Sequence, residues 1–99
     1  MKVEETAVRQ AAEDHAQGVV QGDLRRAGGH LSREAQAAAG DVMKRMPSPL
    51  SACEIVSVGE QGGTYLVDIR YASDSDEITV RSIWSEREGR PRIVGLEVV

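Results

Sequence analysis

The chain has 99 residues, 40% of them hydrophobic, which suits one small globular domain that buries about 65% of its unfolded surface. Its formal net charge is −4 with acidic and basic residues interspersed, which argues against a nucleic-acid surface, and no apolar run is long enough to cross a membrane. The single Cys excludes an internal disulfide, and a polar first segment unlike a signal peptide favours the cytoplasm.

The first half of the chain is rich in helix-forming residues, with apolar side chains recurring every three or four positions. Gly22 is a typical residue after a helix end, and Asp23 and Ser32 are typical N-caps. Gly40 costs about 1 kcal/mol relative to Ala inside a helix, so the last helix can break there. The three predicted helices are Val3–Gln21, Leu24–Ala27 and Arg33–Arg45.

The second half, after Pro47 to Ser51, alternates β-branched and polar residues between short turns. Short connections predict an antiparallel meander with its strands in chain order. Helices followed by strands predict a single α+β domain, with helices over residues 1–46 covering one face of a sheet over residues 52–99. The four predicted strands are Cys53–Val58, Thr64–Ala72, Glu77–Glu86 and Arg92–Val99.

The last three strands can be paired so that one face is apolar and the other charged. The charged face then carries Asp68, Arg81 and Glu97 in a row, with Arg70 beside Thr79. The first hairpin stays open, because each parity turns one awkward residue to the wrong side. The predicted apolar-face pairs are Tyr65–Trp84, Val67–Ser82, Ile69–Val80, Trp84–Val94, Ser82–Leu96 and Val80–Val98, with Arg87 opposite Pro91 at the last turn.

Two segments, AVRQAAEDHAQGVVQGDLRRAGGHLS and YLVDIRYASDSDEITVRSIWSEREGRPRIVGLEVV, cover about two-thirds of the chain and resemble the nuclear transport factor 2-like superfamily. This cystatin-like cone is shared by ketosteroid isomerases and polyketide cyclases. The superfamily usually inserts a small β-hairpin between its second and third helices. Here LSREAQAAAGDVMKRMP reads as helix throughout, which predicts a shortened cone.

The resemblance implies a cone-shaped cavity between the concave sheet face and the helices, and a homodimer built on the outer sheet face. We expect a small apolar ligand and no cofactor. The expected pocket residues are His15, Val19, Met43, Tyr65, Val67, Ser82 and Trp84. The expected dimer face is Leu66, Asp68, Arg70, Thr79, Arg81 and Ile83.

His15 lies seven residues before Gly22-Asp23. In the ketosteroid isomerase branch, a tyrosine at that spacing donates a hydrogen bond to the oxyanion. The isomerases also need a carboxylate base, which has no counterpart here, and a protonated acid on a late strand. The acid's position falls near Ser82, which cannot replace it, so the isomerase mechanism is not expected.

Three roles stay open for His15: a core-edge histidine, which is preferred, a ligand-binding residue, or a catalytic acid or base. The preferred function is a non-catalytic ligand-binding or accessory domain. The alternatives are an isomerase-, cyclase- or hydratase-type enzyme using His15, and a protein-interaction module with a filled cavity. His30 is expected in an exposed loop, two histidines are too few for a metal site, and Cys53 is expected to be a buried small hydrophobe.

Overall fold

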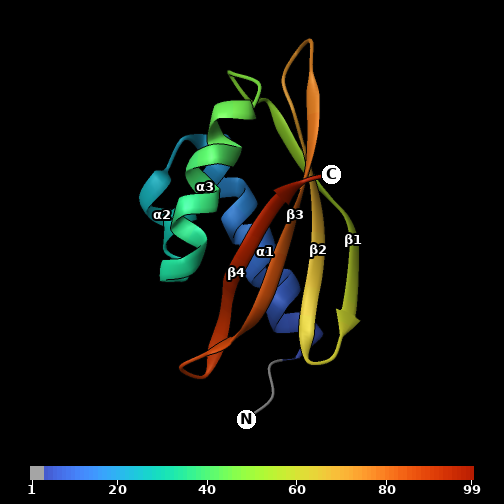
Figure 1. Ribbon diagram of the computed structural model, residues 1–99. Helices are drawn as coiled ribbons and strands as arrows, with labels where there is room; N and C mark the ends of the chain where they lie inside the picture. The colour runs from blue at the N-terminus through green and yellow to red at the C-terminus, as the bar shows by residue number, and fades with distance from the viewer. Residues whose placement is uncertain (1–3) are drawn as a thin grey trace.

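The computed structural model describes residues 4–99, which form three helices followed by one four-stranded antiparallel sheet (Figure 1). The strands follow chain order across the sheet, which confirms the predicted α+β class and meander. The predicted first helical residue, Val3, lies outside the described residues. The elements are α1 (Glu5–Gln21), α2 (Leu24–Gly28), α3 (Arg33–Arg45), β1 (Ala52–Gln61), β2 (Thr64–Ala72), β3 (Glu77–Arg87) and β4 (Arg90–Val98).

The predicted helix ends are confirmed by their hydrogen bonds. Gly22 has a φ of 74°, and its N–H donates to the Val19 carbonyl at 3.2 Å, which ends α1. The Asp23 carboxylate accepts from the N–H of Arg26 at 3.1 Å, and the Ser32 hydroxyl accepts from the backbone N–H three residues on at 3.3 Å. Local sequence therefore sets where the helices begin and end.

The third helix does not break at Gly40, contrary to the sequence-based expectation. Gly40 is exposed, while Ala35 and Val42 on the other side of the helix are buried against the sheet. This packing outweighs the intrinsic helix cost of one glycine, about 1 kcal/mol. The Ser32 N–H also donates to the Ile93 carbonyl at 2.8 Å, which ties the start of α3 to β4.

The β2–β3 register agrees with the prediction at every pair from Tyr65–Trp84 to Ala72–Glu77. The β3–β4 register agrees only away from the turn, because Val94 forms a β-bulge. The turn itself is shorter than predicted: Glu88 and Gly89 have φ of 58° and 81° and connect strands that continue to Arg87 and Arg90. The corrected pairs are Trp84–Ile93 in place of Trp84–Val94, and Arg87–Arg90 in place of Arg87–Pro91.

A second bulge, at Val56, resolves the first hairpin. Ile55 pairs with Ile69 and Ser57 with Asp68, so Val56 is the extra residue and is exposed. The bulge lets both Ile55 and Val58 pack on the core as half-buried residues. Because they are three positions apart, a strand without a bulge would turn them to opposite faces. β1 also continues past the predicted end at Val58, to Gln61.

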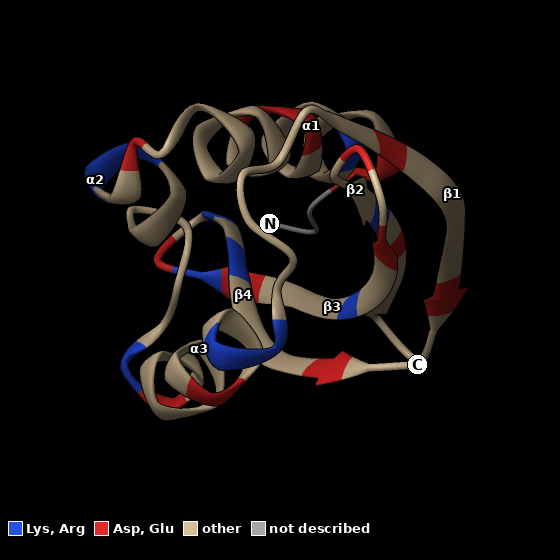
Figure 2. Cartoon of the chain, turned by 90° about the horizontal axis from the view of Figure 1, so that it is seen from above, with Lys and Arg blue, Asp and Glu red and all other residues tan. Residues whose placement is uncertain are grey.

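The sheet is curved and the three helices lie on its concave side (Figures 1 and 2). The convex side carries the predicted charged row: Asp68 pairs with Arg81, and Arg81 with Glu97. No helix within residues 4–99 is long and apolar enough to cross a membrane. The buried hydrophobic residues are Val8, Ala12, Ala16, Ala27, Ala35, Val42, Tyr65, Val67, Ile69, Tyr71, Val80, Trp84 and Ile93.

Candidate functional site

The position of His15 is set by a close contact between α1 and α2. A Cβ added at Gly18 would lie 2.9 Å from the backbone nitrogen of Ala27, so only glycine lets the two helices approach this far. One turn earlier on α1, His15 Nδ1 is 2.9 Å from the carbonyl oxygen of Ala27. The two contacts together hold the His15 ring at the inner face of the helices.

The carbonyl of Ala27 can only accept, so His15 Nδ1 carries the proton and donates. Burial lowers the pKa of His15 below its ordinary value of 6.5, an effect that the hydrogen bond to Ala27 opposes. His30 lowers the same pKa further, and Asp14 raises it. The ring is therefore neutral at pH 7 and its Nε2 is an unprotonated acceptor.

Three rings meet at this point of the core. The His15 ring centroid lies 6.0 Å from that of His30 and 6.3 Å from that of Trp84, both edge to face. His30, expected in an exposed loop, is half-buried because its Nε2 is 2.8 Å from a carboxylate oxygen of Asp14. The Trp84 Nε1–H donates to the Ser82 hydroxyl at 2.8 Å.

A cavity of about 190 Å³ lies beside His15, between the helices and the concave sheet face. No charged side chain lines it. Leu24 and Met43 line it and are 62% and 45% exposed, so they form its mouth. The lining residues are His15, Val19, Leu24, Ala27, Gly28, Leu31, Ala39, Val42, Met43, Met46, Tyr71, Val80 and Leu96.

Two polar side chains, those of His15 and Tyr71, line the cavity. His15 Nε2 and the Tyr71 hydroxyl make no hydrogen bond to any residue from 4 to 99. No side-chain nitrogen or oxygen in that range is both fully enclosed and unpartnered, so each of the two atoms keeps some accessible surface. Burial raises the pKa of Tyr71, which keeps its hydroxyl protonated as a hydrogen-bond donor.

Three of the seven expected pocket residues, His15, Val19 and Met43, line this cavity. The other four are buried but do not line it, because the bulky Tyr65 and Trp84 fill the rest of the space between the helices and the sheet with packed side chains. The Ser82 hydroxyl donates to the Val67 carbonyl at 2.9 Å, so it serves the sheet and not a ligand.

Sequence reasoning missed Tyr71, although a signal for it was available. Tyr71 lies two residues after Ile69 on the same alternating strand, so it belongs to the inward face that Tyr65 and Val67 define. Ile78, its cross-strand partner in the observed register, also packs on the core. Extending the inward-facing alternation from Ile69 to Tyr71 would have predicted Tyr71 as the second polar residue of the cavity.

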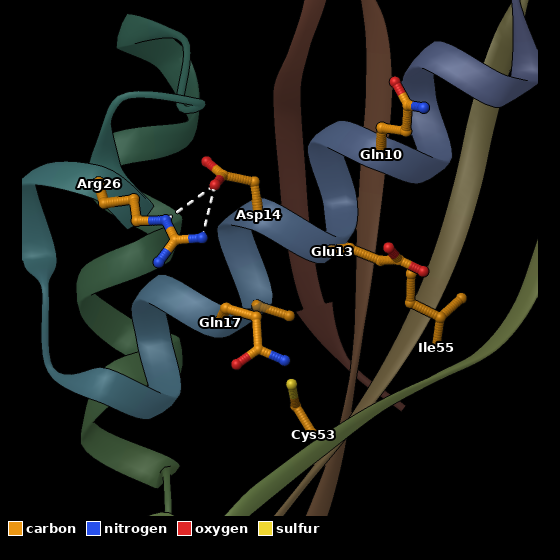
Figure 3. Close-up of a pocket in the computed structure, with 8 residues that line it drawn as sticks. Gln10, Glu13, Asp14, Gln17, Arg26, Cys53 and Ile55 are labelled. Atoms are coloured by element: carbon orange, nitrogen blue, oxygen red, sulfur yellow. Dashed lines mark hydrogen bonds and ion pairs between the residues drawn. The ribbon is translucent and has the colours of Figure 1, made fainter.

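The other side of α1 borders an open groove of about 410 Å³ toward the edge strand β1 (Figure 3). Glu13 and Gln17 of α1 and Cys53 of β1 line it, together with Asp14, whose carboxylate is bound by Arg26 (Figure 3). Cys53 was expected to be fully buried, but it is only half-buried. Partial burial, reinforced by the charge of Glu13, raises the pKa of its thiol, so the thiol is a weak nucleophile.

The six expected dimer-face residues all lie on the convex side of the sheet, away from the cavity. Arg81 forms a two-pronged pair with Asp68, with N–O distances of 2.9 and 3.1 Å. The same contact lowers the pKa of the Asp68 carboxyl. Leu66 and Ile83 face each other across β2 and β3 and are half-buried.

Within residues 4–99, no group of three or more His, Cys, Asp and Glu side chains is placed to hold a metal ion. Comparison with protein-family models, curated proteins and solved structures finds no match to this chain. The arrangement of its own residues is therefore the basis for a functional proposal.

Proposed function

We propose that this protein is a short cone domain of the nuclear transport factor 2-like kind that binds a small neutral molecule beside His15. One observation carries the proposal. The side chains of His15 and Tyr71 line one largely apolar cavity, and neither the acceptor His15 Nε2 nor the donor hydroxyl of Tyr71 bonds to a residue from 4 to 99. Apolar pockets with a few convergent polar groups are the usual form of ligand sites.

The volume and charge of the cavity define the class of ligand. An apolar cavity of about 150 Å³ holds benzene, and drug-sized ligands need about 300 Å³ or more. The volume of about 190 Å³ therefore suits one substituted ring or a molecule of that size. A ligand hydroxyl can donate to His15 and accept from Tyr71, and the lack of charged walls disfavours an ion. This open space also favours a ligand-binding domain over an interaction module with a filled cavity.

The proposal is tested with phenol, toluene and benzoate as probes, using the fluorescence of Trp84 and NMR line positions. We expect phenol to bind best and the charged benzoate worst. Tyr71→Phe should weaken phenol binding about three- to tenfold, as for one lost hydrogen bond, and leave toluene unchanged. Equal binding of phenol and toluene by the wild-type protein would contradict the assigned polar contacts.

A matched pair of variants tests the location of the site. Ala39 lines the cavity, and Ala37 lies exposed on the same helix. Ala39→Phe should abolish binding of all three probes by filling the cavity, whereas Ala37→Phe should leave it intact. Phenol binding that survives Ala39→Phe in a folded protein would place the site elsewhere.

An isomerase-, cyclase- or hydratase-type enzyme is a second candidate, favoured by the acceptor and donor that share one cavity. A neutral His15 is able to take a proton while Tyr71 donates a hydrogen bond to a carbonyl oxygen. The test is deuterium exchange at the α-carbons of cyclohexanone in D₂O, followed by NMR. Exchange above the buffer rate that is lost in His15→Gln would support catalysis, and exchange at the buffer rate would contradict it.

We further propose that the protein forms a homodimer through its convex sheet face. Support comes from the apolar pair Leu66 and Ile83, bordered by the ion pairs of Asp68 with Arg81 and of Arg70 with Glu54. Leu66→Glu combined with Ile83→Glu would bury two unpaired charges in such an interface. Sedimentation should then show a wild-type dimer and a monomeric variant, and an unchanged variant dimer would refute this interface.

A further inference from the structure

Four of the chain's twelve Lys and Arg residues gather in a hollow outside the cavity. The hollow has a volume of about 380 Å³ and lies between α2 and the turn end of the β3–β4 hairpin, which carry Arg on the same side of the molecule (Figure 2). Asp14 is the one carboxylate among its lining residues. An excess of three positive charges therefore sits in one hollow of a chain whose net charge is −4. The four residues are Arg25, Arg26, Arg90 and Arg92.

Two of these arginines are held in place by the protein. Arg26 binds Asp14 through Nε at 2.8 Å and a terminal nitrogen at 2.7 Å, and also donates to Gln21 at 3.0 Å. Arg92 donates to the carbonyl oxygen of Gly29. Each guanidinium has five N–H donors, so both keep donors for another acceptor. These two side chains form a preorganised base of the hollow.

The side chains of the other two arginines, Arg25 and Arg90, make no hydrogen bond or ion pair with any residue from 4 to 99. They belong to elements 65 positions apart in the chain, α2 and β4, and both are exposed at the rim of the same hollow. Gathering like charges in this way is unfavourable unless an anion compensates them. Two fixed and two free guanidinium groups therefore surround a space that favours a multiply charged anion.

We propose that this hollow binds a phosphate group, either as free phosphate or carried on a small molecule. The planar fork of Arg matches the oxygen geometry of phosphate, and a group with two negative charges offsets most of the excess. A small ligand is favoured over a nucleic acid because the arginines line one concave hollow and form no extended stripe. This site is separate from the neutral cavity, because the rings of His30 and His15 lie between them. His30 lines the hollow, His15 lines the cavity, and the two rings are in edge-to-face contact.

The test is a titration with inorganic phosphate at low salt, followed by NMR of the Arg Nε–H signals and by calorimetry. Arg25→Gln with Arg90→Gln should weaken phosphate binding at least about tenfold, because charge-assisted hydrogen bonds are lost. The control is Lys44→Gln with Arg45→Gln, which removes the same charge from exposed positions on α3 that do not line the hollow. It should change the dissociation constant by less than about twofold, since exposed distant charges are screened.

Equal weakening in the control pair, or no signal shift at millimolar phosphate, would overturn the proposal. A parallel titration with glycerol 3-phosphate distinguishes free phosphate from a phosphate group on a small molecule. Tighter binding of glycerol 3-phosphate than of phosphate indicates a phosphorylated small molecule, and equal binding indicates free phosphate. A single-stranded oligonucleotide that binds more tightly than both probes and competes with them would overturn the small-ligand assignment. Should the double variant fail to fold, Arg90→Gln alone provides the same comparison, because the Arg90 side chain has no partner among residues 4–99. Phenol binding is measured alongside, so failure of the anion site is distinguishable from failure of the cavity.

Discussion

The two sides of α1 border hollows of opposite character. Toward α2, α3 and the concave sheet face, His15 and Val19 line a cavity of about 190 Å³ without charged walls. Toward β1, Glu13 and Gln17 line an open groove of about 410 Å³. One helix thus separates a small, largely apolar site from a larger, more polar one.

The difference between the two hollows teaches that burial of the polar groups, and not size, distinguishes the candidate site: His15 and Tyr71 are buried, whereas Glu13 and Gln17 are exposed. In the groove, Asp14 is bound by Arg26 and His30, which together hold the pKa of its carboxyl below the usual range. At the cavity, neither His15 Nε2 nor the Tyr71 hydroxyl bonds to a residue from 4 to 99. An unpaired polar atom in an apolar wall costs stability unless a ligand satisfies it, so the smaller hollow is the better ligand site.

The largest expected effect comes from Gly18, which brings the cavity side of α1 against α2. Gly18→Ala should lower the free energy of unfolding by about 2–3 kcal/mol, because the new methyl group meets a backbone atom that cannot yield. Urea denaturation measures the change. The control is Gly40→Ala, where nothing lies within 4 Å and helix propensity should add up to about 1 kcal/mol. Equal changes in the free energy of unfolding for the two variants would contradict a tight contact between Gly18 and Ala27.

A second comparison deletes two hydroxyl groups from the same inward sheet face. Ser82→Ala should cost about 1–2 kcal/mol, because the buried Trp84 Nε1–H loses its acceptor. Tyr71→Phe should change stability by less than about 0.5 kcal/mol, because its hydroxyl makes no hydrogen bond within residues 4–99 that could be lost. Thermal and urea denaturation of both variants measure these changes in stability. A large cost for Tyr71→Phe would show that its hydroxyl stabilises the fold and is not reserved for a ligand.

The pH dependence of stability probes the buried histidine. Because burial lowers the pKa of His15 in the folded state, the unfolded chain takes up the proton first as the pH falls below 6.5. Stability should fall by up to about 1.4 kcal/mol per pH unit from there until the folded-state pKa is reached, with no loss from His15 above pH 7. His15→Gln keeps a donor for the Ala27 carbonyl and should lose less stability between pH 7.5 and 5.5. Equal losses in both proteins would contradict a lowered pKa.

The smallest effect is expected in the open groove. The side chain of Gln17 is exposed and makes no hydrogen bond to a residue from 4 to 99, so Gln17→Ala should change stability by less than about 0.5 kcal/mol. Phenol binding should also be unchanged, because Gln17 lies on the groove side of α1 (Figure 3). Weaker phenol binding in this variant would mean that the two sides of α1 are coupled.

Much of the fold could be predicted from the sequence because its signals are local. Gly22, Asp23 and Ser32 mark helix ends through their own backbone and side-chain preferences. Inward and outward alternation identified the β2–β3 register, since a slip of one residue would reverse both faces. The candidate site was predicted less completely: His15, Val19 and Met43 line the cavity, whereas Tyr65 and Trp84 only pack around it.

The sequence by itself therefore determined the type, order and caps of the elements, because these depend on residues within a few positions of one another. Tertiary structure alone decided the rest. The bulges at Val56 and Val94 arise where a curved sheet must keep inward residues on the core. The curvature of the sheet around the helices brings His15 and Tyr71 to the wall of one cavity. It also brings four arginines from α2 and β4 into one hollow. That curvature is a property of the whole packed chain and of no single segment.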